Sequence, residues 1–428
     1  MAQQQRFTSL QQWLSWQETL HPSAVDLGLQ RVSTVADRLG CGRPARIVIT
    51  VGGTNGKGSC QALLEAILLR AGYRVGIYSS PHLVRYNERV RLNGATVSDQ
   101  ALCDAFARID RARDDTSLTY FEFGTLAALD IMRHSDLDVA VLEVGLGGRL
   151  DAVNIVDADA SLVSSIGIDH TEWLGSDRDS IGREKAGIFR PGKPAVCGDR
   201  DPPDSIGLEA RRIGALLRVL GRDFQVRTDG RGWHWQGERN AYRNLPQPAL
   251  PGAHQLANAA SVLMVLDMLS EALPVPRRAI DAGLRWMQLP GRIQMIPGKV
   301  EQVLDVSHNA QAALALVDTL RHMPLAGVTH AVIGMMKDKD VSAFVRAIEP
   351  AIAHWYPVGL PFARAMDAAA LAEIIGSVIG GADPPTGFAN MTDALADLRS
   401  RVSAGDRILV CGSFYTLAEW VQLDPDFE

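Results

Sequence analysis

The feature that most constrains the fold is a glycine-rich loop between a predicted strand and a predicted helix. Residues 47–51 are a short apolar run with β-branched side chains, typical of a buried strand, and residues 60–73 have helical periodicity. Between them lies GTNGKGS at 53–59. Glycines let backbone N–H groups approach phosphate oxygens, and the N-terminus of the following helix adds positive potential. The order strand, loop, helix therefore predicts an α/β domain that binds a nucleoside triphosphate.

The loop departs at two places from the common pattern G-x-x-x-x-G-K-[ST]. Val51 stands where the first glycine belongs, and Gly58 separates Lys57 from Ser59. Lys57 can still reach the β- and γ-phosphates, and the Ser59 hydroxyl can still bind Mg²⁺. The alternative is a glycine-rich turn without a ligand, which the strand–loop–helix context disfavours.

Strand and helix signals alternate along most of the chain, which predicts a mostly parallel sheet with helices on both faces. Further strands are expected at 75–78, 139–142, 160–168, 303–306, 328–333 and 407–411, and further helices at 119–134 and 257–269. Residues 200–250 have a weaker pattern and suggest β-structure or excursions beside the sheet, and 289–298, with two prolines, suggest a hinge. We therefore expect an ATP-binding domain at 1–292 and a smaller, Rossmann-like α/β domain at 293–428.

Composition narrows the functional classes. The formal net charge of -6 gives no support for a nucleic-acid partner. Five cysteines lie far apart without a CxxC pair, which argues against a disulfide framework and for a reduced, cytoplasmic protein. The N-terminus lacks the apolar core of a signal peptide, and no run of ~18 apolar residues occurs, so we expect no membrane span.

Polar side chains lie at or near the ends of several predicted strands, where open α/β sheets bind ligands. Ser79, Ser80 and His82 surround a proline turn after the strand at 75–78. Glu143 ends an apolar run, where a carboxylate is costly unless it is paired or bound to metal. The structural alternatives are turn chemistry for the serines and an ion pair for Glu143.

Two further groups follow later in the chain. Asp169 and His170 come after the strand predicted at 160–168, and Glu184 and Lys185 lie in REKAGI. A lone histidine is more often a structural group than a ligand, and the pattern by itself places Lys185 on a solvated helix face. Hydroxyl, carboxylate and imidazole groups can all bind Mg²⁺, although imidazole is an unusual ligand for a hard cation. A triphosphate needs metal charge for phosphoryl transfer. The candidate metal ligands and the glycine-rich loop, predicted in one sheet, therefore strengthen each other as evidence for a nucleotide site.

Seven blocks in a fixed order carry a family resemblance. They are GTNGKGS at 53–59, YSSPHLVRYNERV at 78–90, LEVGLGGRLDAVN at 142–154, SIGIDHTEWLG at 165–175, REKAGI at 183–188, LPGR at 289–292 and DVSHN at 305–309. Together they resemble the bacterial folylpolyglutamate synthases, in the bifunctional form that is also a dihydrofolate synthase. GTNGKGS is shared by the wider Mur ligase superfamily, whose loop carries the extra glycine. The SSPHL and GLGGRLDA blocks are more specific to the folate branch.

The resemblance implies a role for each matching position. The residues implied to hold ATP are Gly53, Thr54, Asn55, Gly56, Lys57, Gly58, Ser59, Asn258, Arg292 and Asp305. Those implied to hold one or two Mg²⁺ ions are Ser80, Glu143 and His170. Lys57, His308 near the reacting phosphate and a carbamylated Lys185 are the implied catalytic groups. The implied pteroate-binding residues are Thr119, Tyr120, Phe121, Glu122, Leu150, Asp151 and Ala152.

The implied reaction is phosphorylation of a pterin carboxylate by ATP, followed by attack of the L-glutamate amine on the acyl phosphate. The expected substrates are dihydropteroate, tetrahydrofolate and L-glutamate, handled by a monomer whose two domains close over them. A monofunctional folylpolyglutamate synthase is the nearest alternative, and TYFE at 119–122 favours the bifunctional form. A Mur-type peptidoglycan ligase needs an N-terminal domain for which about fifty residues are too few. A regulatory P-loop switch is disfavoured by Gly58 and by the separate C-terminal domain.

Overall fold

The structure, a computed structural model, describes residues 6–229, 232–380, 384–423 and 426–427. It divides into two compact units: Met1–Ala249 with Leu256–Met287, and Leu250–Gln255 with Gln288–Glu428. The change of unit between Met287 and Gln288 lies beside the segment 289–298 that the sequence marks as a hinge. In the described ranges, no helix is long and apolar enough to cross a membrane.

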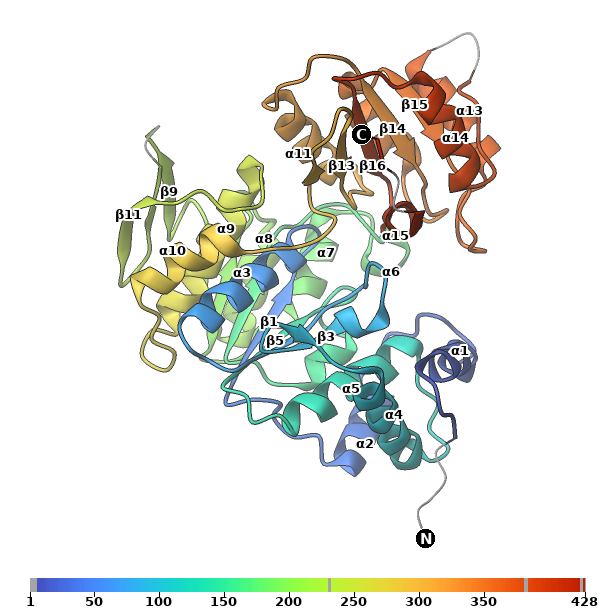
Figure 1. Cartoon of the computed structure of the whole chain (residues 1–428). Coiled ribbons are helices and arrows are strands. Elements are labelled where there is room, and N and C mark those ends of the chain that lie inside the picture. The colour runs from blue at the N-terminus through green and yellow to red at the C-terminus, as the bar shows by residue number, and fades with distance from the viewer. Residues whose placement is uncertain (1–5, 230–231, 381–383, 424–425, 428) are drawn as a thin grey trace. The chain divides into compact units, whose positions relative to one another are not determined.

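The first unit is built around an eight-stranded sheet (Figure 1). Its strands lie in the order β4-β3-β2-β5-β1-β6-β7-β8, with bounds β1 Ile47–Gly52, β2 Val75–Tyr78, β3 Val90–Leu92, β4 Ala95–Thr96, β5 Val139–Glu143, β6 Ala160–Val163, β7 Pro194–Cys197 and β8 Leu216–Val219. The strands from β2 to β8 in this order pair in parallel, and only β3 and β4 run antiparallel to their neighbours. The prediction of a mostly parallel α/β sheet is confirmed.

A second, antiparallel sheet explains the weaker pattern at 200–250. Its strands are β9 Gln225–Thr228, β10 Trp233–Gln236 and β11 Ala241–Leu245. Trp233 and Trp235 of β10 are buried, and Trp235 stacks on Tyr242 at 5.5 Å between ring centroids. The alternation of buried tryptophan with more exposed residues is the period expected of a sheet that packs on one face.

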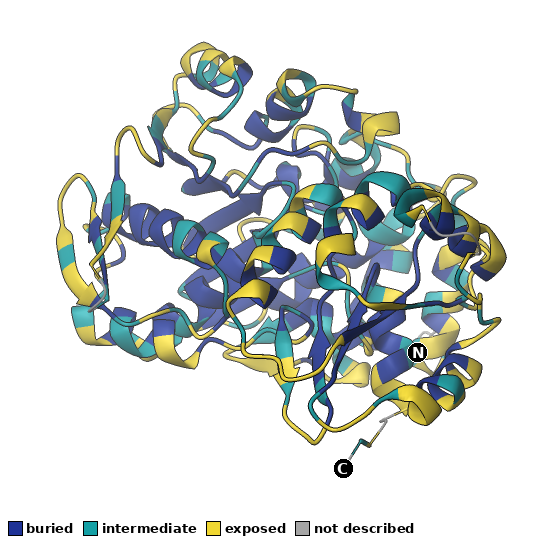
Figure 2. Ribbon diagram, turned by 90° about the horizontal axis from the view of Figure 1, so that it is seen from above, coloured by how far each residue is buried: buried dark blue, intermediate teal, exposed yellow. Residues whose placement is uncertain are grey.

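Helices cover the large sheet on both faces. Through Met287 they are α1 Leu10–Leu20, α2 Gln30–Leu39, α3 Lys57–Arg70, η1 Tyr86–Arg89, α4 Asp99–Arg113, α5 Tyr120–Arg133, η2 Ala152–Ile155, α6 Thr171–Leu174, α7 Arg178–Ala186, α8 Asp204–Ile213, α9 Ala253–Met268 and α10 Arg277–Trp286. One apolar cluster joins α1, α2, α4 and α5 to the sheet, and another joins α7 and α8 to it. Figure 2 shows the consequence: the central strands of the large sheet, such as β1, β5 and β6, are buried, whereas helices expose one side.

The second unit has a five-stranded sheet in the order β12-β13-β16-β14-β15. Its elements are β12 Gln294–Ile296, β13 Glu301–Leu304, α11 Ala310–Arg321, β14 Thr329–Ile333, α12 Val341–Ile348, η3 Glu349–Ala351, β15 His354–Pro357, α13 Ala368–Ile379, α14 Met391–Arg401, β16 Arg407–Cys411 and α15 Phe414–Leu423. Only β12 pairs antiparallel. The expectation of a smaller α/β unit at the C-terminal end is confirmed.

Two sequence-based expectations are wrong at the level of single elements. The strand predicted at 160–168 ends at Val163. Ser164 makes the last bonds to β1, at Gly52 O, and the hydroxyls of Ser164 and Ser165 then donate to Asn55 O in the glycine-rich loop, which has no strand ladder to continue. The segment 289–298, expected as a hinge without secondary structure, contains the short strand β12, which pairs with β13 and lies between the two prolines of the segment. A strand at the edge of a sheet tolerates flanking prolines because one side of its backbone needs no partner.

Candidate active site

The glycine-rich loop lies between β1 and α3 at the carboxyl edge of the sheet. Gly53 and Gly56 have φ angles of 137° and 87°, a region that side-chain-bearing residues rarely adopt. A β-carbon at Gly53 would collide with Ser164 Oγ, and one at Gly56 with Asn258 Oδ1. Both the backbone conformation and the close approach of Asn258 therefore require glycine, as a phosphate-binding loop does.

The segment after β6 holds this loop in shape. Thr54 N donates to Ser165 O at 2.8 Å, and Asn55 N donates to Ser165 Oγ at 3.1 Å. Thr54 Oγ1 donates to Gly167 O at 3.1 Å, and Ser164 Oγ donates to Asn55 O at 2.6 Å. The two serines are supporting residues that the sequence does not reveal, although Ser165 begins the block SIGIDHTEWLG. Their pattern predicts strand residues, and nothing local distinguishes the two roles.

Lys57 begins α3 and folds back over the loop. Its ammonium Nζ donates to Gly53 O at 3.0 Å and to Thr54 O at 3.1 Å. Ser59 follows in the first turn of α3 and is buried, at 2% exposure. A cation and a hydroxyl thus lie at a helix N-terminus, where the macrodipole already favours a bound anion.

Ser80 and Glu143 are neighbours at the same edge of the sheet. Ser80 follows β2, Glu143 ends β5, and Ser80 N donates to Glu143 Oε2 at 3.4 Å. Glu143 is buried at 5% exposure. Because β5 lies between β2 and β1, this carboxylate stands beside the strand that carries the glycine-rich loop.

His170, the third predicted metal ligand, lies farther from the end of its strand than expected. It precedes α6, with φ 51°, after a non-strand segment that leaves β6 at Val163. Its Nε2 lies 4.0 Å from Asp169 Oδ1, and its side chain is 38% exposed. Within the described ranges, no group of three His, Cys, Asp or Glu side chains has an arrangement that could hold a metal ion.

Lys185 is buried, so its placement on a solvated helix face is wrong. It lies in α7 at 3% exposure. Burial lowers the pKa of Lys185 to about 7, the nearby Lys57 ammonium contributes to the lowering, and Asp169 opposes the shift. A lysine with this pKa is substantially neutral at physiological pH, and a neutral amine is a nucleophile.

The two segments predicted to bind pteroate meet in the first unit. α5 begins at Tyr120 after the cap residue Thr119, and η2 begins at Ala152 after Leu150 and Asp151. A β-carbon at Gly145, in the loop before η2, would collide with the Phe121 ring. The glycine therefore lets an aromatic side chain of α5 lie on the backbone of the 145–151 loop.

Asp151 shapes that loop from inside. Its Oδ2 accepts from Leu146 N at 2.8 Å and its Oδ1 from Val153 N at 2.9 Å. Burial raises the pKa of Asp151 to about 7, against the lowering effect of the N–H groups of Leu146, Val153 and Gly145. A half-protonated buried carboxyl beside a predicted binding segment is a group that can exchange a proton near neutral pH.

Arg89 is a further residue to which the sequence pattern assigns no role. It is 9% exposed, and its guanidinium lies 5.2 Å from the ring centroid of Tyr86 and 5.6 Å from that of Tyr120. Its Nε donates to His82 Nδ1 at 2.9 Å. Burial first, and the Arg89 charge second, lower the pKa of His82 to about 4, so this ring is neutral. The site thus has a buried cation next to Tyr120, in the block YSSPHLVRYNERV.

The remaining predicted residues divide between the two units. Asn258 belongs to α9 in the first unit and lies against Gly56. Arg292, Asp305 and His308 belong to the second unit. There the Arg292 guanidinium lies 5.0 Å from the Phe414 ring centroid, and His308 Nδ1 lies 2.9 Å from Val306 O. That these three residues hold the same nucleotide as the glycine-rich loop stays a prediction.

An α/β sheet with a phosphate-binding loop, followed by a second α/β unit, is the architecture of an ATP-dependent ligase of the Mur type. The Mur ligase middle domain matches residues 51–208, and the Mur ligase glutamate ligase domain matches residues 291–414. The chain is 44% identical to the dihydrofolate synthase/folylpolyglutamate synthase of Escherichia coli over 98% of this chain and 96% of that one. It is 39% identical to that of Haemophilus influenzae over 96% of each.

Solved structures agree with the sequence comparison. The E. coli FolC structure in complex with DHPP and ADP has a TM-score of 0.92 at 43% identity, covering 98% of this chain and 99% of that one. A bifunctional folylpolyglutamate synthase/dihydrofolate synthase with Mn, AMPPNP and L-glutamate bound has a TM-score of 0.90 at 44% identity, with the same coverage. The chain belongs to the family of the dihydrofolate synthase/folylpolyglutamate synthases.

Proposed function

We propose that this ligase joins L-glutamate to dihydropteroate, giving dihydrofolate, and to tetrahydrofolate, giving polyglutamates. The observation that carries the proposal is the glycine-rich loop, braced by Ser164 and Ser165 with Lys57 folded over it, in a chain that aligns with bifunctional relatives over nearly its whole length. The ligands of the solved relatives are DHPP, ADP, AMPPNP, Mn and L-glutamate, which are the classes of molecule that such a reaction uses.

A carboxylate is a poor electrophile, and ATP removes that obstacle. An oxygen of the pterin substrate's carboxylate attacks the γ-phosphorus, ADP leaves, and an acyl phosphate forms. The neutral amine of glutamate then attacks the carbonyl carbon, inorganic phosphate leaves, and the nitrogen loses a proton as the amide forms. Each step replaces one leaving group by one nucleophile, so the only net cost is the phosphoanhydride of ATP.

Lys57 and the loop do the electrostatic part of this chemistry. The N–H groups in the first turn of α3, which begins at Lys57, would face the phosphates, whereas those of Thr54 and Asn55 are already bonded to Ser165. The Lys57 ammonium, which donates to Gly53 O and Thr54 O, would turn toward the γ-phosphate when nucleotide binds. Preorganised donors of this kind stabilise charge that spreads over the transferring phosphoryl group.

Glu143 and Ser80 fit a hard divalent cation, because a carboxylate and a residue that carries a hydroxyl are neighbours at the edge that carries the loop, joined through the backbone N–H of Ser80. With His170 they would hold Mg²⁺. When bound, the ion supplies positive charge to the phosphate oxygens. Burying the Glu143 carboxylate is costly unless a cation or several hydrogen-bond donors face it, which also favours a cation at this site.

We propose further that Lys185 is carbamylated. Its burial and its lowered pKa favour the neutral amine, which can attack CO₂, form a carbamate and release a proton. The change turns an amine that is cationic only when protonated into an anion, so the repulsion between protonated Lys185 and Lys57 is replaced by an attraction. The carbamate would then stand beside Asp169 as part of an anionic group suited to metal ions.

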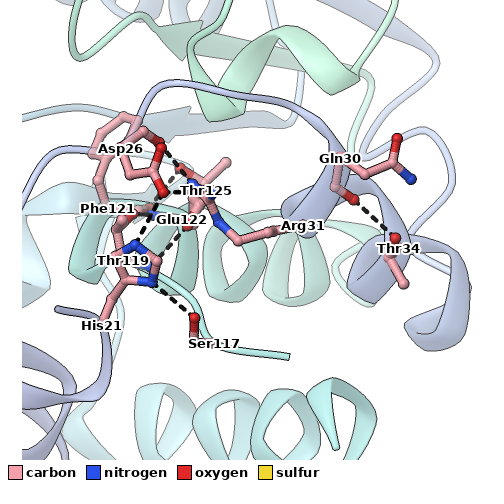
Figure 3. A network of polar contacts seen from close by, with 10 residues as sticks. All are labelled: His21, Asp26, Gln30, Arg31, Thr34, Ser117, Thr119, Phe121, Glu122 and Thr125. Atoms are coloured by element: carbon pink, nitrogen blue, oxygen red, sulfur yellow. Dashed lines mark hydrogen bonds and ion pairs between the residues drawn. The ribbon is translucent and has the colours of Figure 1, made fainter. Parts of the chain in front are cut away.

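Residues 119–122 and 150–152 are proposed to bind the pteroate part of the substrate. Their support is the close packing of Phe121 on Gly145 and the buried carboxyl of Asp151 beneath the same loop. Glu122 has a structural role and is not expected to contact the substrate, because its carboxylate accepts hydrogen bonds from Thr119 N and from Arg31 (Figure 3). It holds the start of α5 in position, so the direct contacts with substrate are expected from its neighbours.

A cytoplasmic location is the remaining proposal. All five cysteines are free thiols, four of them buried, which suits a reducing compartment.

The deciding experiment is a phosphate-release assay with ATP, Mg²⁺ and L-glutamate, run with dihydropteroate and with tetrahydrofolate as separate acceptors. Glutamate-dependent phosphate release with both acceptors is the expected result. Release with tetrahydrofolate alone would leave a monofunctional folylpolyglutamate synthase. Release that is independent of glutamate would contradict ligation altogether.

A further inference from the structure

The segment that follows β6 is held by two sets of partners, and the glycine-rich loop is only the first of them. Residues 165–170 contain no helix or strand. Thr54 N donates to Ser165 O, and Thr54 Oγ1 accepts from Gly167 N at 3.0 Å and donates to Gly167 O at 3.1 Å. Ile166 lies between these two partners of Thr54, and its own backbone groups bond elsewhere.

Two charged side chains bind the backbone of Ile166. Asp199 Oδ2 accepts from Ile166 N at 3.0 Å, and Arg178 Nε donates to Ile166 O at 3.0 Å. Arg178 Nη2 also donates to Asp199 Oδ2 at 3.0 Å, so the two side chains form an ion pair. We call Arg178 and Asp199 the bracing pair. It supplies both of the hydrogen bonds that a neighbouring strand would give to Ile166 in a sheet.

The bracing pair is anchored outside the segment that it holds. Arg178 is the first residue of α7, and its Nη2 donates to Asp201 O at 2.8 Å. Asp199 follows β7, and its Oδ1 accepts from Asp201 N at 3.1 Å. A β-carbon at Gly198 would lie 2.7 Å from Ser164 O, so glycine is what lets the chain after β7 run this close to the segment. The position of the pair is therefore set by α7 and by the turn after β7.

The ion pair is partly buried, which strengthens its effect on the segment. The side chain of Asp199 is 13% exposed and that of Arg178 is 38% exposed, so the pair is screened less than a surface pair. Its hydrogen bonds to Ile166 are charge-assisted and stronger than neutral ones. Since Thr54 bonds to both neighbours of Ile166, and Asn55 N donates to Ser165 Oγ, a displacement of Ile166 is passed directly to the glycine-rich loop.

We propose that the bracing pair positions the glycine-rich loop for nucleotide, so that Arg178 and Asp199 are positioning residues for ATP. Their effect passes through Ile166 to Thr54 and Asn55. The inference rests on the proposed function only in its ATP-binding step. It predicts a loss of nucleotide affinity that the pteroate-binding segments do not share, because neither 119–122 nor 150–152 supplies a partner in these contacts.

The test compares Arg178→Gln with Arg74→Gln in the whole chain. Arg74 is a matched control, because its Nε donates to Asp138 Oδ2 at 3.2 Å in a pair that is 48% and 23% exposed. This control pair lies at the amino ends of β2 and β5, the opposite edge of the same sheet from the glycine-rich loop. For each variant we would measure the Kd of AMPPNP with Mg²⁺ by calorimetry, the KM for dihydropteroate and the melting temperature.

Arg178→Gln should raise the Kd of AMPPNP about tenfold, as expected for the loss of charged hydrogen bonds, with the KM for dihydropteroate within about twofold of wild type. Arg74→Gln should leave both constants unchanged, even where it lowers the melting temperature as much. Arg178→Lys keeps the charge with a single donor group and should restore part of the affinity. In nucleotide-free protein, amide hydrogen exchange of residues 164–170 should be faster in Arg178→Gln and unchanged in Arg74→Gln.

An unchanged Kd of AMPPNP in Arg178→Gln would overturn the proposal, whether or not exchange of the segment becomes faster. A rise in Kd that is matched by the KM for dihydropteroate would overturn it as well, because it would show a general loss of structure. If Arg178→Gln does not fold, Asp199→Asn decides the question, since it removes the ion pair and keeps an acceptor for Ile166 N. Its Kd should rise at least about threefold, and a wild-type Kd would refute the role.

The binding measurement needs no acceptor substrate, so it separates this inference from the proposed function. Wild-type protein that joins glutamate to neither acceptor would refute the proposed function. The Kd values of AMPPNP decide the role of the bracing pair in either case.

Discussion

Lys57 is the side chain on which the proposed chemistry depends most directly. It is the loop's own cation, held by Gly53 O and Thr54 O at the N-terminus of α3. Lys57→Ala should lower kcat by at least about 100-fold, because a preorganised donor to the transferring phosphoryl group is lost. Initial rates at saturating ATP measure the effect, and rates near wild type would refute the role. Lys193→Ala, which removes an exposed lysine paired with Asp159, is the control and should leave kcat unchanged.

The neutral state of Lys185 gives a prediction with a defined pH dependence. Its pKa in the folded protein is about 7, so the neutral fraction rises as pH increases through 7. At a fixed pressure of ¹³CO₂, a carbamate signal in the ¹³C NMR spectrum should therefore grow from about pH 6 to about pH 8. Lys185→Met, which fills a similar volume without an amine, should lack the signal. A spectrum with no signal that depends on Lys185 would contradict carbamylation.

The free energy of unfolding should also rise with pH because of Lys185. In protein free of CO₂, the unfolded chain keeps the Lys185 proton up to the ordinary lysine pKa of 10.5, whereas the folded chain loses it near 7. The unfolded state binds more protons in this window, so the free energy of unfolding should rise with pH there. Urea unfolding of wild type and Lys185→Met measures the difference between them, which should shift in favour of wild type as pH rises from about 7 to about 9. A constant difference would show that the amine is ionised in both states.

Prediction from the sequence was most limited at single residues. The loop's glycines and Lys57 could be predicted because a phosphate site imposes their order locally. The burial of Lys185 could not, since REKA has the composition of a solvated helix face and its cover comes from elsewhere: the backbone of Lys185 packs against Gly148, from the block GLGGRLDA. Ser164, Ser165 and Arg89 were missed for the same reason, because their partners are not evident from the neighbouring sequence.

At the level of elements, apolar strands were predictable and their polar extensions were not. β2 and β16 have the bounds that the sequence indicates, because each is an uninterrupted buried run. The strand predicted at 160–168 is too long because serine and isoleucine suit a strand as well as a loop. β12 escaped prediction because its pairing with β13 is decided by the second unit's sheet and not by its own propensity.

The short helix η2 provides an element-scale prediction. Asp151 caps it and also binds Leu146 N, so the loop before η2 depends on two carboxylate oxygens. Asp151→Asn presents an NH₂ group to one of these N–H donors and should destabilise the fold by about 1–3 kcal/mol, the cost of an unsatisfied buried donor. The KM for dihydropteroate should rise as well. Asp157→Asn, at an exposed aspartate paired with Arg190, is the matched control and should change neither quantity.

The pH dependence of this loss follows from the raised pKa of Asp151, about 7 in the folded state against an ordinary aspartate value of 3.8. Between these values the folded state binds more protons than the unfolded state, so the contribution of Asp151 to stability declines as pH rises toward 7. The free-energy difference between wild type and Asp151→Asn in urea should therefore be larger at about pH 5 than at about pH 8. A difference that stays constant between about pH 5 and about pH 8 would mean that the backbone N–H groups outweigh burial and keep the carboxylate ionised in both states.

On the scale of the whole molecule, the chain passes between two units, each with its own sheet. The second unit has a separate apolar core, formed by residues of β13, β14, β16 and the helices α11, α12 and α13. Apart from residues 250–255, it is continuous from Gln288 onward. A unit of this size with a closed core is expected to fold by itself.

The fragment 288–428 should therefore unfold in a single cooperative thermal transition, followed by circular dichroism. A fragment 306–428 is the control. It lacks β12 and β13, which pair with each other and, through β13, with β16. Their loss makes the apolar strand β16 an edge strand that pairs only with β14, and it removes Val303 from the core. The shorter fragment should aggregate or lack a cooperative transition. Cooperative melting of both fragments would mean that β13 contributes little, and melting of neither would mean that the second unit needs the first to fold.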